Sequence, residues 1–282
     1  MNPEQQHEAM NWPGRLRAVA LVTGIGLFFF ALGVFYVLPG VMQFWIWPET
    51  PPLGCVFVAA MFAGGAAPLL WIGLSGHLSA IRAAMLTGVV ANTGIALHLF
   101  SKHALPGNER YLPFSAVFAF GAILAGTVLA LIRHLPPPSD RRCPPVVRWA
   151  FLLASAILLP VGVSLVLDVP HVFPIPLTTD MAAVYGWFIL GSFVYFVYGF
   201  WKPSWLNSTG QLLSFLIYDL LMIPPYVGYG SVVYPEDRTS LFVYLAVLLT
   251  SAVFCSYFLF IDPRTRLFKS RASIASPSQE LA

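Results

Sequence analysis

Eight apolar stretches, each long enough to cross a lipid bilayer, constrain this chain more than any other feature of its sequence. A spanning helix needs about 20 apolar residues, since each residue adds about 1.5 Å across a hydrocarbon core about 30 Å thick. Of the 282 residues, 58% are hydrophobic and only 10% are charged, whereas soluble domains have about 25% charged residues. The sequence therefore predicts an all-α, multi-pass integral membrane protein. The predicted spans are Ala18–Leu38, Cys55–Ser75, Ala80–Phe100, Leu112–Ile132, Val147–Leu167, Met181–Trp201, Gly210–Gly230 and Leu241–Ile261.

The distribution of lysine and arginine predicts the side of the membrane that each loop faces. Eight spans place both termini on one side, and that side then carries twelve of the fifteen basic residues. The other side carries only Lys102, Arg110 and Arg238. Because short cytoplasmic loops are enriched in basic residues, we expect both termini to be cytoplasmic. This topology accounts for the net charge of +3 without a nucleic-acid partner.

Two loops on the predicted outer side have related sequences. The first is FWIWPETPPLG, from Phe44 to Gly54, and the third is VFPIPLTTDMA, from Val172 to Ala182. An alignment of their prolines also aligns their threonines, and each segment then enters an apolar span. The pattern resembles bacterial multi-pass membrane proteins of uncharacterised function that carry a W-P-W-P-L-T-P-L stretch before a helix. Glu49 departs from the leucine usual in that family. The resemblance implies a duplication and no activity.

The duplication predicts two parallel four-helix repeats related by an axis along the membrane normal, because each half has an even number of spans. The first repeat would cover residues 18–133 and the second residues 147–261. A cytoplasmic linker, residues 134–146, would join them. Cytoplasmic tails, residues 1–17 and 262–282, would flank them, and we expect the polar N-terminal tail to be disordered.

Asp219 is the most informative single residue, because it lies near the middle of the predicted span Gly210–Gly230. An ionised carboxylate at mid-membrane costs at least about 2.5–3.5 kcal/mol. Burial would favour the neutral acid, which can donate a proton, so Asp219 is a candidate acid catalyst, proton relay or ligand for a cation. The structural alternative is a carboxyl bonded to Asn92, Thr93 or a backbone carbonyl freed by Pro224.

Alignment of the third and seventh spans places Asn92 and Thr93 on Tyr218 and Asp219, all near mid-span. If both pairs face one pseudo-axis, they form a single intramembrane polar site between the halves. We therefore predict Tyr218, Asn92 and Thr93 as ligand-binding residues.

The helical period adds three neighbours to Asp219. Phe215, Met222 and Tyr226 share its face of the seventh span. An aromatic and methionine lining around one acid favours a lipophilic small molecule as the ligand, although a packed helix interface would have the same pattern.

Glu49 and Asp180 lie in the two related outer loops, where prolines favour extended backbone. One interpretation is an outward vestibule with Glu49 as a second catalytic acid and Asp180 as a ligand-binding residue. The alternative is a set of solvated loop charges beside an aromatic belt at the membrane surface.

The sequence predicts no metal site and no cofactor. The three cysteines are far apart, and the histidines have neither the i, i+4 spacing of a zinc helix nor facing mid-span positions. P-loop, G-x-G-x-x-G and H-E-x-x-H motifs are absent from the sequence.

Three functions remain open from the sequence. The first is an intramembrane enzyme with acid-catalysed isomerase or cyclase chemistry, similar in broad logic to terpene cyclases. The second is a proton-coupled carrier that uses the repeat interface, and the third is a non-catalytic scaffold or lipid sensor. The expected partners are the lipid bilayer and a lipophilic small molecule, and no particular oligomeric state is predicted.

Overall fold

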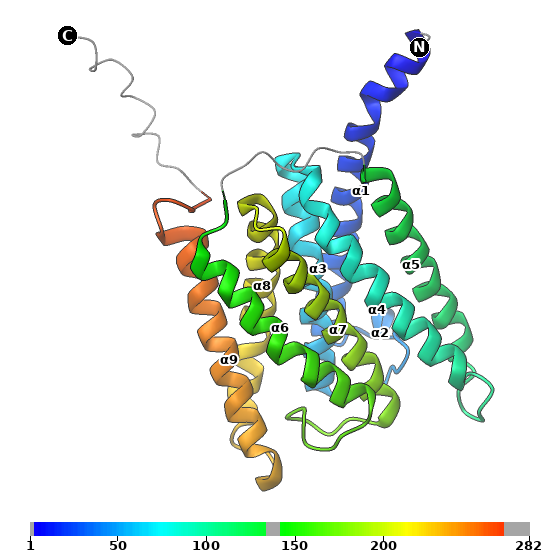
Figure 1. Ribbon diagram of the computed structural model, residues 1–282. Coiled ribbons are helices and arrows are strands. Elements are labelled where there is room, and N and C mark those ends of the chain that lie inside the picture. The colour runs from blue at the N-terminus through cyan, green and yellow to red at the C-terminus, as the bar shows by residue number, and fades with distance from the viewer. Residues whose placement is uncertain (1–2, 134–141, 268–282) are drawn as a thin grey trace.

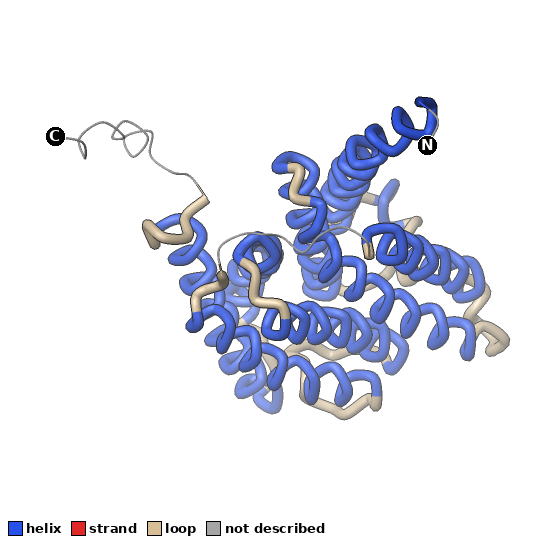
Figure 2. Tube along the Cα trace, turned by 45° about the horizontal axis from the view of Figure 1, so that its top comes forward, coloured by secondary structure: helices blue, strands red, loops and turns tan. Residues whose placement is uncertain are grey.

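The computed structural model describes residues 3–133 and 142–267, which consist of helices and loops without a strand (Figures 1 and 2). Eight of its helices are long and apolar enough to cross a membrane, which confirms the predicted eight spans. The spanning helices are α1 (Pro3–Phe35), α3 (Pro52–Ser75), α4 (Ile81–Lys102), α5 (Tyr111–Ile132), α6 (Pro145–Val166), α7 (Thr179–Trp201), α8 (Trp205–Tyr229) and α9 (Arg238–Ser256). The shorter elements are α2 (Pro39–Met42), η1 (Leu78–Ala80), η2 (Pro235–Asp237) and η3 (Tyr257–Ile261).

Two helices begin five or more residues before the predicted span. Helix α1 begins at Pro3, so the prediction of a disordered N-terminal tail was wrong over residues 3–17. This segment begins with proline and continues with Glu, Gln, Ala and Met, which favour helix. Helix α8 begins at Trp205 instead of Gly210, because the Ser204 side chain caps it by accepting a hydrogen bond from the Asn207 N–H (3.4 Å).

The eight spans form two rows of four. One row runs α1, α3, α8, α9 and the other runs α5, α4, α7, α6, with each helix packed against its neighbours in the row. In Figure 1 the second row lies nearer the viewer. Helices α3 and α7 are the most buried of the eight spans, so the centre of the protein lies where these two helices meet.

The two halves of the chain lie side by side and share both rows. Each row takes two helices from residues 18–133 and two from residues 147–261, because α3 packs on α8 and α4 packs on α7. The predicted two-repeat arrangement stays a prediction. Within the predicted linker, residues 134–141 lie outside the described ranges, as do residues 268–282 of the C-terminal tail.

We name the two ends of the bundle after the parts of the chain that they contain. The terminal end contains the base of α1 and the end of η3, and the distal end contains the loops 36–51, 103–110, 167–178 and 230–237 (Figure 1). At the terminal end two arginines bond the last carbonyls of the two central helices. Arg17 donates from Nε to Gly73 O (2.5 Å), and Arg148 donates from Nε to Phe200 O (3.0 Å). These bonds satisfy backbone groups that a helix end leaves unpaired.

Glycines allow the helices of one row to approach closely. A Cβ added at Gly186 of α7 would lie 2.8 Å from two backbone atoms of α6, Gly162 O and Val166 N. A Cβ at Gly94 of α4 would lie 2.0 Å from the Trp187 ring of α7. Such contacts require glycine, since a membrane helix pair gains most of its stability from close packing.

We expect Gly186→Ala to destabilise the protein by about 1–3 kcal/mol, because the new methyl group meets backbone that cannot rotate away. Gly26→Ala is the control: a Cβ there meets nothing within 4 Å, so stability should be unchanged. The three cysteines are buried, and a thiol-reactive dye in a thermal ramp therefore reports unfolding. Equal melting temperatures for the two variants would contradict the close α6–α7 contact.

Candidate functional site

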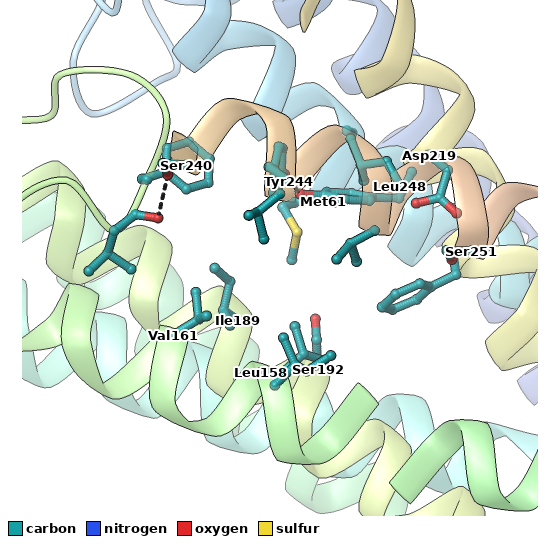
Figure 3. Close-up of a pocket in the computed structure, with 18 of the residues that line it drawn as sticks. Met61, Leu158, Val161, Ile189, Ser192, Asp219, Ser240, Tyr244, Leu248 and Ser251 are labelled. Atoms are coloured by element: carbon teal, nitrogen blue, oxygen red, sulfur yellow. Dashed lines mark hydrogen bonds between the residues drawn. The ribbon is translucent and has the colours of Figure 1, made fainter. Parts of the chain in front are cut away.

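A cavity of about 440 Å³ lies between α6, α7, α8 and α9, with α3 behind it. We call it the Asp219 cavity. In Figure 3, Leu158, Val161 and Ile189 of α6 and α7 face Tyr244 and Leu248 of α9 across the empty space. Most of the wall is apolar, so the cavity suits a lipophilic molecule better than a hydrophilic solute.

Asp219 carries the one carboxyl group deep in this cavity, and the exposed fraction of the residue is 0%. Neither carboxylate oxygen has a hydrogen-bond partner of regular geometry among the described residues. Ser251 of α9 lies beside the carboxyl in Figure 3 and is the side chain placed to donate a hydrogen bond to it, although not in regular geometry. A buried polar group without a full set of partners costs about 1–3 kcal/mol or more, so the carboxyl is poorly explained as a structural anchor.

Aromatic side chains surround the inner part of the Asp219 cavity. The hydroxyl groups of Tyr218 and Tyr244 hydrogen-bond to each other, which joins α8 to α9. Phe215 lies 6.2 Å from Tyr218 and Phe173 lies 5.6 Å from Tyr244, measured between ring centroids. The faces of such rings attract positive charge.

The distal mouth of the cavity is polar and acidic. His171 and Glu236 line it, and His171 Nδ1 lies 2.9 Å from Asp237 Oδ1. Ser240 donates a hydrogen bond to Val172 O (3.1 Å), which fixes the loop before α7 (Figure 3). The described residues that line the cavity include no lysine and no arginine, so no basic side chain there offsets the charge of Asp219.

The cavity opens sideways between α6 and α9. These helices meet at the terminal end, where Val147 and Phe151 belong to one apolar cluster with Cys255 and Phe258. They separate toward the distal end (Figure 1), since α6 packs on α7 and α9 packs on α8. Ile157 of α6 and Val243 and Val247 of α9 line the cavity and are exposed, so the cavity is open on this side of the bundle.

The face of α8 that carries Asp219 points into the protein. Phe215, Tyr218 and Asp219 line the cavity. Met222 and Tyr226 are both 0% exposed and lie one and two turns further along, within the main apolar core. They support the wall and do not reach the empty space.

The prediction of a single polar site was wrong, because the structure does not bring together its four residues, Asn92, Thr93, Tyr218 and Asp219. Asn92 lines a different cavity, and Thr93 is exposed on the outer face of α4. Helices α4 and α8 lie in different rows, because α4 packs between α5 and α7. Asp219 therefore lies among helices of the second half, with α3 as the one contribution from the first.

The two outer-loop acids have different surroundings. Glu49 is exposed and lines neither cavity, so the structure does not bring it to Asp219 as a second acid. Asp180 accepts a hydrogen bond from the Tyr111 hydroxyl (2.8 Å), and His98 Nε2 lies 3.0 Å from its other oxygen. Trp47 Nε1 donates to the Tyr111 oxygen (3.1 Å). Asp180 thus joins α4, α5 and α7 at the distal end, outside both cavities.

The sequence reasoning missed the contribution of α9. Tyr244, Leu248 and Ser251 all line the Asp219 cavity, and their spacing of four and three residues places them on one helix face. That period was visible in the sequence. This face of α9 contains no charged residue, so the sequence did not distinguish it from an ordinary packing face.

Within the described ranges, no three His, Cys, Asp or Glu side chains lie close enough together to hold a metal ion. Comparison with protein-family models, curated proteins and solved structures finds no match to this chain.

We expect Tyr111→Phe and Asp180→Asn each to destabilise the protein by about 1–2 kcal/mol, because each weakens a hydrogen bond to a partly buried carboxylate. The double variant should cost less than the sum of the two, because both changes affect the same bond. Glu49→Gln is the control, an exposed acid of the same end of the bundle. Unfolding in a detergent titration measures all four, and additive effects would argue against the Tyr111–Asp180 bond.

Proposed function

We propose that the protein binds a lipophilic small molecule in the Asp219 cavity and acts on it with Asp219 as the proton donor. The observation that carries this proposal is a fully buried carboxyl without a regular hydrogen-bond partner in the wall of an apolar cavity. Intramembrane acids are costly, and function is the default explanation for one that its neighbours leave unsatisfied.

The chemistry that fits is acid catalysis on a carbon–carbon double bond. The carboxyl proton of Asp219 moves to one alkene carbon, and the π electrons form the new C–H bond. The neighbouring carbon becomes a cation, which the rings of Phe215, Tyr218 and Tyr244 stabilise. Loss of a proton from an adjacent carbon to the Asp219 carboxylate restores the acid, so the net reaction is an isomerisation. A cyclisation follows when a second double bond attacks the cation first.

The position of the cavity favours this enzyme over a carrier. A carrier built on the repeat interface would have its site on the axis between the halves. The Asp219 cavity lies instead mostly among α6, α7, α8 and α9, all from the second half. Its lateral opening serves a substrate that both enters from and returns to the hydrocarbon core.

We also infer that the two halves arose by duplication, with both termini cytoplasmic. Three features support the duplication. The counterpart spans of the two halves are α1 and α6, α3 and α7, α4 and α8, and α5 and α9. Exchanging each span for its counterpart turns the first row, α1, α3, α8, α9, into α6, α7, α4, α5, which is the second row in reverse order. Arg17 of α1 and Arg148 of α6 make equivalent hydrogen bonds, each to a carbonyl near the end of a central helix. Phe57 and Tyr185 are equivalent in the loop alignment and stack on each other with centroids 4.4 Å apart. The basic residues of the terminal end support the orientation.

We expect Asp219→Asn to abolish turnover while the protein stays as stable as the wild type, and Asp219→Leu to be more stable by about 1 kcal/mol or more. The reason is that the carboxyl makes no regular hydrogen bond that its removal would break. The dye-based melt gives the stability of each variant. A marked loss of stability in both variants would identify Asp219 as a structural anchor and contradict the proposal.

Labelling with dicyclohexylcarbodiimide tests access to the site. This apolar reagent reacts with protonated carboxyls that it reaches from the membrane, so mass spectrometry should find the adduct on Asp219. Val161→Trp should suppress the adduct, because Val161 lines the cavity. Val163→Trp on the exposed face of the same helix should leave it unchanged. An adduct that both variants retain would place the route to Asp219 elsewhere.

A further inference from the structure

A second cavity, of about 380 Å³, lies between α1, α3, α4, α5 and α7. We call it the Asn92 cavity. It adjoins the Asp219 cavity, because Met61, Ser192 and Ser214 line both. Side chains of α3, α7 and α8 thus form a common wall between the two.

We propose that the Asn92 cavity is a separate binding site for a neutral lipophile that carries one hydroxyl or carbonyl group, as a long-chain or isoprenoid alcohol does. Asn92 is the residue that binds this polar group. The proposal stands on the geometry of this cavity and does not require any activity of Asp219.

The carboxamide of Asn92 is available to a ligand. No hydrogen bond joins it to any other residue in the described ranges, although an amide both donates and accepts. Two glycines flank it: a Cβ at Gly121 would lie 3.1 Å from Asn92 Nδ2, and one at Gly88 would lie 3.8 Å from the same atom. Larger side chains at these positions would press on the amide and narrow the space beside it.

A second polar group in the wall of this cavity also lacks a hydrogen-bond partner. Thr87 lines the cavity one turn before Ala91, and its hydroxyl oxygen is buried without a hydrogen-bond partner among the described residues. Threonine in a helix commonly bonds the carbonyl four residues earlier. Two polar groups without partners on one face of α4 indicate that a ligand satisfies them.

The chemistry of the lining selects a neutral ligand. No Asp, Glu, His, Lys or Arg is among the residues that form this cavity, whereas the Asp219 cavity contains two carboxylates and a histidine. A charged group would find no partner here and would be costly in so apolar a site. A hydroxyl or carbonyl needs only the hydrogen bonds that an amide and a threonine provide.

The opening of the Asn92 cavity admits a molecule from the bilayer. Val19, Ala20 and Thr23 of α1 and Leu124 and Ala125 of α5 form its sides. Helix α1 packs on α3 and α5 packs on α4, so these two helices are not packed against each other. The polar group of a lipophile then lies at Asn92 while its chain extends between α1 and α5.

Photolabelling of the full-length protein tests the proposal, with diazirine-bearing hexadecanol as the neutral probe and diazirine-bearing hexadecylamine as the charged one. Below saturation, the alcohol should form adducts on Met85 and Leu124, which line the cavity. Asn92→Leu should lower this labelling about fivefold, the factor that one ordinary hydrogen bond contributes. Thr93→Val, at the exposed neighbouring position, should leave it unchanged, and so should Asp219→Asn.

Three results would overturn the proposal. The alcohol could label Phe120 and Ile123 on the outer face of α5 as strongly as Leu124, which would mean that it samples the surface only. The amine could label Leu124 as strongly as the alcohol, or Asn92→Leu could leave the labelling unchanged. Gly121→Val crowds the carboxamide without removing it, so it should give the same decrease even if Asn92→Leu does not fold.

Discussion

The contact between α3 and α7 is the constraint on which the rest of the structure depends. Phe57 stacks on Tyr185 with ring centroids 4.4 Å apart, and the Tyr185 hydroxyl donates to Gly54 O (3.1 Å). Both rings are fully buried. This contact joins the two rows at their centre, which α4 and α8 complete. The peripheral helices are α1 and α5 on one side and α6 and α9 on the other. Each cavity is the space left between this centre and a peripheral pair whose members do not pack on each other.

Two carboxyls of the chain differ in how fully their neighbours satisfy them. Asp180 uses both oxygens, one toward Tyr111 and one toward His98, and joins three helices at the distal end. Asp219 is more deeply buried and has no comparable partner. A buried polar group that strengthens packing is a satisfied one. The contrast within one molecule explains Asp180 by its contacts and leaves Asp219 without such an explanation, which is consistent with the function that we propose for it.

The sequence predicts the spans and the inward face of α8 well, because mean hydropathy and the helical period are local properties. It fails where the neighbours of a helix matter. Asn92 and Thr93 do not meet Asp219, because α4 is fixed against α7 by the approach of Gly94 to Trp187. No pattern in either helix encodes that pairing before the glycine contacts are known. The interface between the two halves is equally hidden in the sequence, since short loops do not show that α3 will pack on α8 and α4 on α7.

The duplication that we infer would explain why the protein has two similar cavities. Exchange of each span for its counterpart converts the helices around the Asp219 cavity into those around the Asn92 cavity. Two copies of one apolar cavity would then carry different polar groups at positions that are not counterparts, the acid of Asp219 in one and the amide of Asn92 in the other. A shared wall of small and flexible residues, Met61, Ser192 and Ser214, separates them. The acid and the amide thus lie in separate cavities, on opposite sides of that wall.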